Sequence, residues 1–185
     1  SMSYPEFIRT LKPTVPAHLA MMNASTVLFR GAAYTAFDGA LPDGNLVHGA
    51  LAMRYAHTTA PLRRLVDRYV GEICVALTAG VPVPDWVRSE LAGLPAIMAE
   101  SDARAKKYER GVVDMLEALV LSKRVGQTFT GTVIEVDRDG TDGIVILEDP
   151  AVEAKVSGKV RLGDEITVKL VSADTTTGTV QFAAV

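Results

Sequence analysis

The feature that most constrains the fold is a change in the spacing of hydrophobic residues near Gly126. Beyond it, apolar residues tend to alternate with polar ones, which is the period of a strand with one buried face. Five such runs, separated by turns rich in Gly and Asp, cover residues 128–136, 143–147, 152–156, 165–171 and 179–182. Five short strands in so little chain are typical of an OB-fold barrel. We therefore predict a five-stranded barrel over residues 126–185.

Before Gly126 the hydrophobic residues recur mainly at helical spacing. Prolines and glycines divide this part of the chain, since neither continues a helix well. Helices are expected within residues 3–31, with a break at Lys12-Pro13, a new start at Pro16 and a stop at Gly31. Further helices are expected over residues 62–79, closed by Gly80, over residues 85–92, and from Pro95 to about residue 123. The fold class is thus α+β, with a mostly helical part over residues 3–125 followed by the barrel.

The apolar stripes of the two longer helices predict buried faces. They consist of Leu62, Leu65 or Val66, Tyr69, Ile73, Ala76 and Leu77 in the first helix, and Ile97, Tyr108, Val112, Met115, Leu116 and Leu119 in the second. Charged residues of both signs over residues 102–110 of the second helix favour a solvated face, with a surface lining RNA as the alternative.

Two strands are expected between the helices, over residues 32–38 and 46–56, and their spacing is compatible with a hairpin. Turns are indicated by Asp38-Gly39 and by residues 42–44. The second strand leads into a helix that we expect to open at Pro61, because proline is well tolerated at the first helical position. This places Arg63 and Arg64 in the first turn, where they add to the partial positive charge of the helix N-terminus. A phosphate would relieve that concentration of positive charge.

The charge of the chain is unevenly distributed. Residues 1–125 carry 14 Lys+Arg and 12 Asp+Glu, whereas residues 126–185 carry 5 and 10. This step supports a domain boundary near residue 125 and indicates that the barrel alone is not a strong phosphate binder. Its aromatic residues, Phe129 and Phe182, could both belong to the core rather than stack on bases.

The single cysteine, Cys74, excludes an internal disulfide framework. It lies in an apolar helical run, so we expect it to be buried. No apolar run reaches the roughly 20 residues needed to span a bilayer. We expect no membrane partner and a cytoplasmic setting.

The stretch from Tyr55 to Asp67 carries the most specific motif. Seven of its residues match, position by position, the pattern Tyr-x-His-Phe-Thr-Ser-Pro-Ile-Arg-Arg-Tyr-x-Asp: Tyr55, His57, Thr59, Pro61, Arg63, Arg64 and Asp67. Thr58, Ala60 and Leu65 depart from it. The stretch resembles the signature of the RNase II/RNase R (RNB) family of 3′-to-5′ exoribonucleases. The helical segment and the S1-like barrel that follow it also resemble the C-terminal part of such a protein.

The resemblance implies that Arg63 is catalytic, placed at the scissile phosphate to stabilise charge developing in the transition state. A planar guanidinium suits that role because it can donate two parallel hydrogen bonds to phosphate oxygens. The alternative for Arg63 is an ion pair with Asp67, four residues on along the helix. We expect Asp67 to orient Arg63 rather than to bind metal.

Five further residues are candidate RNA contacts: Tyr55, His57, Thr59, Arg64 and Arg68. For Tyr55 and His57 the alternative is a packed core position, and for Arg64 it is an ion pair with a carboxylate. Because Ala60 stands where the family has Ser, the helix loses a capping hydroxyl. The open backbone donors would then be left for phosphate, water or Thr59.

Catalysis in the family resembles Mg²⁺-dependent phosphodiester hydrolysis, with an aspartate cluster holding the ions. That cluster belongs to the first half of the family domain. None precedes Tyr55 here, where Asp38 and Asp43 resemble turn residues. We therefore expect no metal site in this chain and no RNA cleavage by the chain alone. The expected partners are single-stranded RNA and the missing N-terminal half of the RNB domain; the oligomeric state is left open.

Two other hypotheses are retained. The first is a module without nuclease activity that binds RNA or protein and derives from an RNB remnant. The second is a structural partner that docks on another protein through exposed apolar surface.

Overall fold

The computed structural model describes residues 2–29, 33–42, 44 and 47–185. By internal contacts the chain forms two compact units, one of Ser1–Gly31 with Lys107–Val185 and the other of Ala32–Lys106. These units are defined by contacts and not by independent folding, so the domain boundary expected near residue 125 stays a prediction. Gly31 and Asp43, expected as a helix stop and a turn residue, lie outside the described residues.

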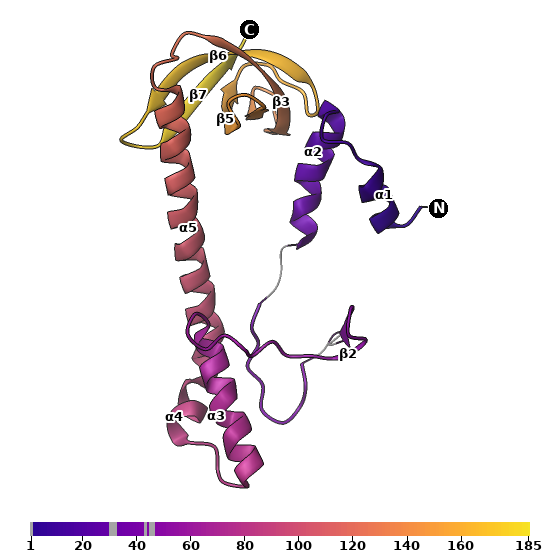
Figure 1. The fold of residues 1–185 in the computed structure, drawn as a ribbon, viewed down its shortest axis with the longest axis vertical. Helices are drawn as coiled ribbons and strands as arrows, with labels where there is room; N and C mark the ends of the chain where they lie inside the picture. The colour runs from indigo at the N-terminus through magenta and orange to yellow at the C-terminus, as the bar shows by residue number, and fades with distance from the viewer. Residues whose placement is uncertain (1, 30–32, 43, 45–46) are drawn as a thin grey trace. The chain divides into compact units, whose positions relative to one another are not determined.

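The C-terminal strands form the closed five-stranded barrel that their alternating pattern predicts (Figure 1). They are β3 (Thr128–Val136), β4 (Asp142–Leu147), β5 (Val152–Ser157), β6 (Glu165–Asp174) and β7 (Thr179–Ala184). The order around the barrel is β3-β4-β5-β7-β6. All pairs are antiparallel except β5 with β7, so the sheet is mixed, as in an OB-fold.

Inward-facing residues from all five strands fill the barrel. Phe129 and Phe182 are both buried and pack edge to face, with ring centroids 5.9 Å apart. Gly131 makes room for this core, because a Cβ there would lie 2.6 Å from side-chain atoms of both Val145 and Leu147. The barrel therefore has no aromatic side chain left on its surface, since Phe129 and Phe182 are the only aromatic residues in residues 126–185.

Two short helices in the N-terminal segment belong to the same unit as the barrel. They are α1 (Tyr4–Thr10) and α2 (Pro16–Ser25), followed by the 3₁₀ turn η1 (Thr26–Phe29). The break before Pro16 is confirmed. Ala20 of α2 is buried, and Ala17 lies so close to Gly163 that a Cβ on that glycine would meet the Ala17 Cα at 3.1 Å. Small residues thus let α2 pack closely against the barrel.

The long helix α5 (Leu94–Leu121) leads into the barrel. Its last turns join the barrel core through Ala118 and Leu121. Polar contacts support this packing, since Glu117 accepts the Glu153 backbone N–H at 3.0 Å and Arg110 Nη2 donates to the Glu153 carbonyl at 3.4 Å. The charged residues over 102–110 are exposed, with pairs four residues apart such as Lys106 with Asp102.

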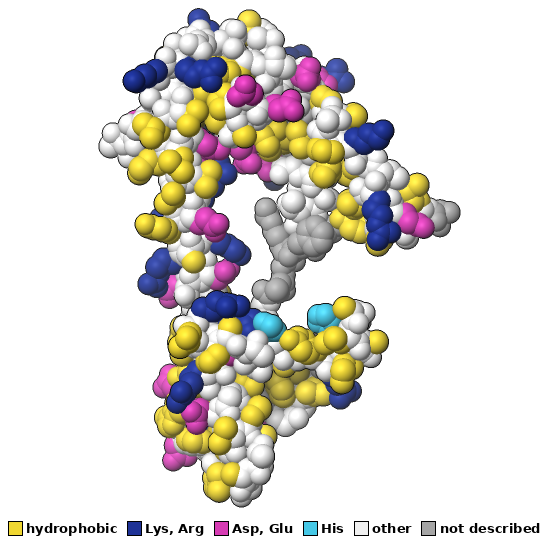
Figure 2. Space-filling model, in the orientation of Figure 1, with side chains coloured by type: hydrophobic (Ala, Val, Ile, Leu, Met, Phe, Trp, Pro, Cys, Tyr) yellow, Lys and Arg dark blue, Asp and Glu magenta, His cyan; other side chains and the backbone are white. Residues whose placement is uncertain are grey.

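The buried stripe expected on α5 is wrong. Its six members, Ile97, Tyr108, Val112, Met115, Leu116 and Leu119, are between 43% and 77% exposed. Hydrophobic side chains accordingly appear at the surface in Figure 2. The stripe expected on the helix over residues 62–79 is also largely wrong, because Ala76 is its only buried member and Leu62 is fully exposed. Hydrophobic spacing indicates that a face is apolar, but a neighbouring element must cover the face for it to be buried.

The second unit contains a small hairpin, three helical segments and the first part of α5. Strands β1 (Val47–His48) and β2 (Met53–Arg54) pair antiparallel, and α3 (Leu65–Ala79), α4 (Asp85–Glu90) and the 3₁₀ turn η2 (Leu91–Gly93) follow. Gly80 ends α3 with φ at +67°, as expected from its position. Tyr69 of α3 packs edge to face on Trp86 of α4 at 5.2 Å between ring centroids.

Three expectations for this unit are wrong. Residues 33–38 form no strand, and residues 47–54 fold into a hairpin of their own, because the N–H groups of Leu51 and Ala52 both bond to the His48 carbonyl and close a tight turn. Cys74 lies in α3 as expected but is exposed, because α3 meets α4 through Tyr69 and leaves the cysteine uncovered.

Among the described helices, none combines the length and apolar character that crossing a bilayer requires.

Candidate nucleic-acid interface

The motif from Tyr55 to Asp67 is irregular over residues 55–60 and forms a turn over residues 61–63 before the helix begins. Helix α3 starts at Leu65, and the preceding Arg64 is extended, with φ −126° and ψ 102°. The N–H groups of Arg63 and Arg64 both donate to the Ala60 carbonyl, at 3.2 and 2.9 Å. The expectation that Pro61 opens the helix, with both arginines in its first turn, is therefore wrong. The two arginines lie just ahead of the helix.

Asp67 organises this turn. Its Oδ2 atom accepts hydrogen bonds from the Ala60 N–H at 2.8 Å and from Arg64 Nε and Nη2 at 3.0 and 2.6 Å. The carboxylate is only 1% exposed. Burial raises the pKa of Asp67, but the Ala60 N–H and the Arg64 guanidinium more than offset that effect and hold the pKa below its ordinary value.

Two expectations change as a result. Asp67 holds Arg64 rather than Arg63, because the extended backbone at Arg64 turns its guanidinium onto the carboxylate. The Ala60 N–H, which we expected to be open to phosphate, water or Thr59, is occupied by the same carboxylate. Asp67 is seven positions after Ala60 in the chain, so this one side chain closes the whole turn.

The three arginines of the motif consequently differ in availability. Arg64 is paired with Asp67, and Arg68 is paired with Glu72 at 2.7 Å in an exposed contact. Arg63 is exposed, and its guanidinium makes no hydrogen bond or ion pair with any described residue. Of the three, Arg63 can donate to an external anion without first giving up a partner.

Tyr55 and His57 lie beside this turn. The Tyr55 hydroxyl and His57 Nδ1 are 2.7 Å apart and hydrogen bonded, and Arg64 Nη2 donates to the His57 carbonyl at 3.3 Å. Both rings are exposed, so the alternative that they are core residues is wrong. Thr59 is exposed too, and no hydrogen bond of its side chain occurs within the described part of the chain.

One residue of this surface was missed by sequence reasoning. His48 of β1 lies against Tyr55, with ring centroids 5.2 Å apart and an interplanar angle of 70°. The signal in the sequence that could have pointed to His48 is the charge of the stretch in which it lies. The 23 residues between Asp43 and Asp67 contain three arginines and two histidines but no carboxylate.

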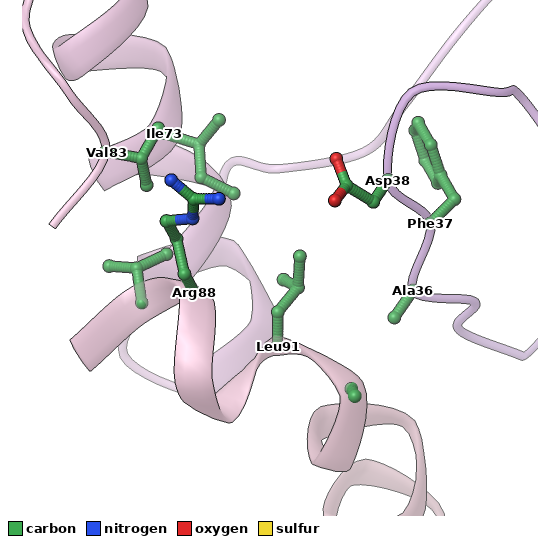
Figure 3. Close-up of a pocket in the computed structure, with 9 residues that line it drawn as sticks. Ala36, Phe37, Asp38, Ile73, Val83, Arg88 and Leu91 are labelled. Atoms are coloured by element: carbon green, nitrogen blue, oxygen red, sulfur yellow. The ribbon is translucent and has the colours of Figure 1, made fainter. Parts of the chain in front are cut away.

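A pocket lies elsewhere in the second unit (Figure 3). It measures about 650 Å³ and is lined partly by apolar side chains, including Ile73 and Leu91. Arg88 and Asp38 point into it from opposite walls (Figure 3). None of the candidate RNA contacts lines this pocket.

The described residues do not fit a Mg²⁺ site. Hard cations require several oxygen ligands, usually with more than one carboxylate. Within the described part of the chain, no group of three or more His, Cys, Asp or Glu side chains is placed to hold a metal ion. Asp67, the one carboxylate of the motif, is committed to Arg64.

Parts of this chain are similar to known proteins. Residues 127–185 match the family model described as the RNase II-type exonuclease C-terminal S1 domain. Ribonuclease R of Mycoplasma pneumoniae is 28% identical over 161 residues, covering 70% of this chain and 22% of the relative. The chain is thus similar to the C-terminal region of RNase R/RNase II-type proteins.

Solved structures show a similarity of the fold. The apo form of Mycoplasma genitalium RNase R superposes with a TM-score of 0.60 at 18% identity, covering 76% of this chain and 26% of that one. The same protein in complex with ribose-methylated single-stranded RNA gives 0.60 at 17% identity, covering 75% and 26%. The chain thus spans about a quarter or less of the relatives that it matches.

Proposed function

We propose that this chain is the C-terminal part of a 3′-to-5′ exoribonuclease that hydrolyses single-stranded RNA, and that Arg63 binds the phosphate at the bond to be cut. The observation that carries the proposal is the difference between the arginines. Asp67 neutralises Arg64, whereas Arg63 is exposed and makes no side-chain bond within the described part of the chain. The RNA complex solved for the M. genitalium relative supports RNA as the ligand class.

The turn gives Arg63 a defined position. Ala60 is fixed by Asp67, and the Ala60 carbonyl in turn accepts the N–H groups of Arg63 and Arg64. The backbone that carries Arg63 is therefore held at both ends without use of its side chain. Preorganised positive charge of this kind stabilises a phosphate whose negative charge increases in the transition state.

Asp67 and Arg64 act in this proposal through positioning, and Tyr55, His57, Thr59 and Arg68 contact the RNA strand around Arg63. Arg68 must exchange its exposed pair with Glu72 to do so, a pair of the kind that contributes little in water. Because the described residues do not fit a Mg²⁺ site, no step of the proposal passes through a metal held by this chain. In the proposal, the preceding part of an RNB domain supplies the ions, and the complete enzyme acts in the cytoplasm.

A second function is favoured by one observation. The barrel carries 5 Lys+Arg against 10 Asp+Glu, and both of its aromatic rings are buried. Single-stranded RNA usually binds such barrels through basic grooves and exposed aromatic rings. The second candidate is therefore a module that binds RNA or protein without cutting, in which the surface around Arg63 rather than the barrel would contact RNA.

The experiment is single-turnover degradation of a labelled single-stranded RNA by the full-length protein with Mg²⁺. Arg63→Ala is compared with wild type and with Arg104→Ala, which removes the same charge from an exposed pair with Glu100. We expect Arg63→Ala to lower the rate by about 100-fold or more, the effect of removing one preorganised donor. Near-equal rates for both variants would refute the role of Arg63. RNA binding without cleavage by the wild-type protein would support the second function.

A further inference from the structure

The hairpin that precedes the motif holds rings that sequence reasoning did not connect. His48 and Met53 are register partners, and the turn between them is closed by two bonds to the His48 carbonyl, from the N–H groups of Leu51 and Ala52 at 3.2 and 2.8 Å. This turn brings His48 back along the chain to Tyr55. Local backbone geometry, rather than a hydrophobic core, therefore fixes the position of His48.

Three rings form one contiguous surface as a result. Tyr55 lies between His48, at 5.2 Å between ring centroids, and His57, at 5.9 Å and an interplanar angle of 44°. The Tyr55 hydroxyl is also bonded to His57 Nδ1, which restricts both side chains. Ordering of this kind lowers the entropy lost when a ligand binds.

These rings are at the surface. Tyr55 is 45% exposed, and both imidazoles are exposed as well. They lie in the same 23-residue stretch without a carboxylate as Arg63, which follows His57 by six residues and is exposed. Exposed aromatic rings beside unneutralised cations are the combination that binds single-stranded nucleic acid, since bases stack on the rings while cations hold the backbone.

We propose that His48, Tyr55 and His57 form a base-stacking platform, and that His48 is a nucleobase contact in its own right. This inference rests on the proposed function, because it assumes that RNA reaches the surface at Arg63. It assigns the two kinds of contact to different residues. The platform binds bases and Arg63 binds phosphate, so loss of either affects a different part of the ligand. The charge of the stretch favours RNA over a protein partner.

The test measures fluorescence anisotropy of two labelled probes with the 185-residue chain. One probe is decaadenylate, and the other is a chain of ten abasic ribose phosphates with the same charge. His48→Ala should weaken decaadenylate binding about five- to tenfold, as expected for loss of one stacking contact, and should change abasic binding less than twofold. Arg63→Ala should weaken binding of both probes. Met53→Ala is the matched control, because Met53 lies opposite His48 in the hairpin and is exposed but has no ring.

Each outcome decides between explanations. If His48→Ala binds decaadenylate as wild type does, or weakens both probes equally, the platform is refuted even when Arg63→Ala shows the phosphate contact. If Met53→Ala weakens decaadenylate to the same extent, the effect belongs to the hairpin fold and the platform is again refuted. If wild type binds neither probe, both the platform and RNA binding by this chain are refuted, and a protein-facing surface is the remaining explanation. Tyr55→Phe, which keeps the ring but loses the bond to His57, should weaken decaadenylate less than His48→Ala does.

Discussion

The pair formed by Asp67 and Arg64 allows a quantitative test of how the turn is held. Replacing Asp67 with Ala leaves two groups without their acceptor, the Ala60 N–H and a guanidinium whose side chain is 21% exposed. Removing one partner of a buried ion pair costs about 3–5 kcal/mol. Because Arg64 retains some access to water, we expect Asp67→Ala to lower the free energy of unfolding by roughly 2–4 kcal/mol.

Trp86 provides the signal for this measurement. It is the only tryptophan of the chain, and it packs on Tyr69 of α3. Urea unfolding followed by its fluorescence therefore reports on the helices that the turn precedes. A double-mutant cycle with Arg64→Ala should give a coupling free energy of about 1.5–3 kcal/mol, as expected for hydrogen bonds to a charged group.

The control is Arg68→Ala, which breaks an exposed pair with Glu72 and should cost less than about 1 kcal/mol. Should Asp67→Ala cost no more than this control, or should the cycle give no coupling, the carboxylate does not hold the turn. The reasoning that separates Arg64 from Arg63 would then fail.

Four further outcomes are expected. Because folding lowers the pKa of Asp67, this carboxylate stabilises the fold above the ordinary carboxylate pKa of about 4, and the stabilisation is lost as the pH falls through the pKa of the folded state. In acid unfolding followed by Trp86 fluorescence, Asp67→Asn should therefore remove the loss of stability that comes from protonation of Asp67. Gly143→Ala should unfold or strongly destabilise the barrel in circular dichroism melts, since its Cβ would collide with the Glu135 carbonyl oxygen, and a wild-type melting temperature would contradict the register. Phe182→Ala should cost about 3–5 kcal/mol in urea unfolding of the barrel, because the ring is fully buried, and a cost below 1 kcal/mol would contradict that core. Ala52→Gly should slow hydrogen exchange of the amide at position 52, because Ala52 has φ at +50°, which glycine adopts with less strain; faster exchange would argue against this turn.

The parts of the fold that sequence could predict are those whose signal is local. The barrel strands were found because alternation and turn residues repeat five times, and the register depends on residues within that same segment. The end of α3 was found because Gly80 can adopt the left-handed conformation that closes a helix. Neither needs information from a distant residue.

The start of α3 could not be found in the same way. Pro61 is an acceptable first helical residue, and only the contact between Asp67 and the Ala60 N–H shows that the chain turns there instead. The same contact decides which arginine is neutralised, so the pairing of Asp67 was misassigned. The apolar faces of α3 and α5 failed for another reason, because amphipathic spacing does not identify what covers a face. His48 was missed because its neighbour Tyr55 is seven residues away and becomes adjacent only through the hairpin.

The most direct test of the central claim is the salt dependence of single-stranded RNA binding by this chain. Each phosphate neutralised on a single strand contributes about 0.7 to the slope of log K against log salt concentration. We expect Arg63→Ala to reduce the magnitude of the slope by about that amount, and Arg104→Ala to leave it unchanged. An Arg63→Ala slope equal to that of wild type would show that this guanidinium holds no phosphate, and would contradict the account.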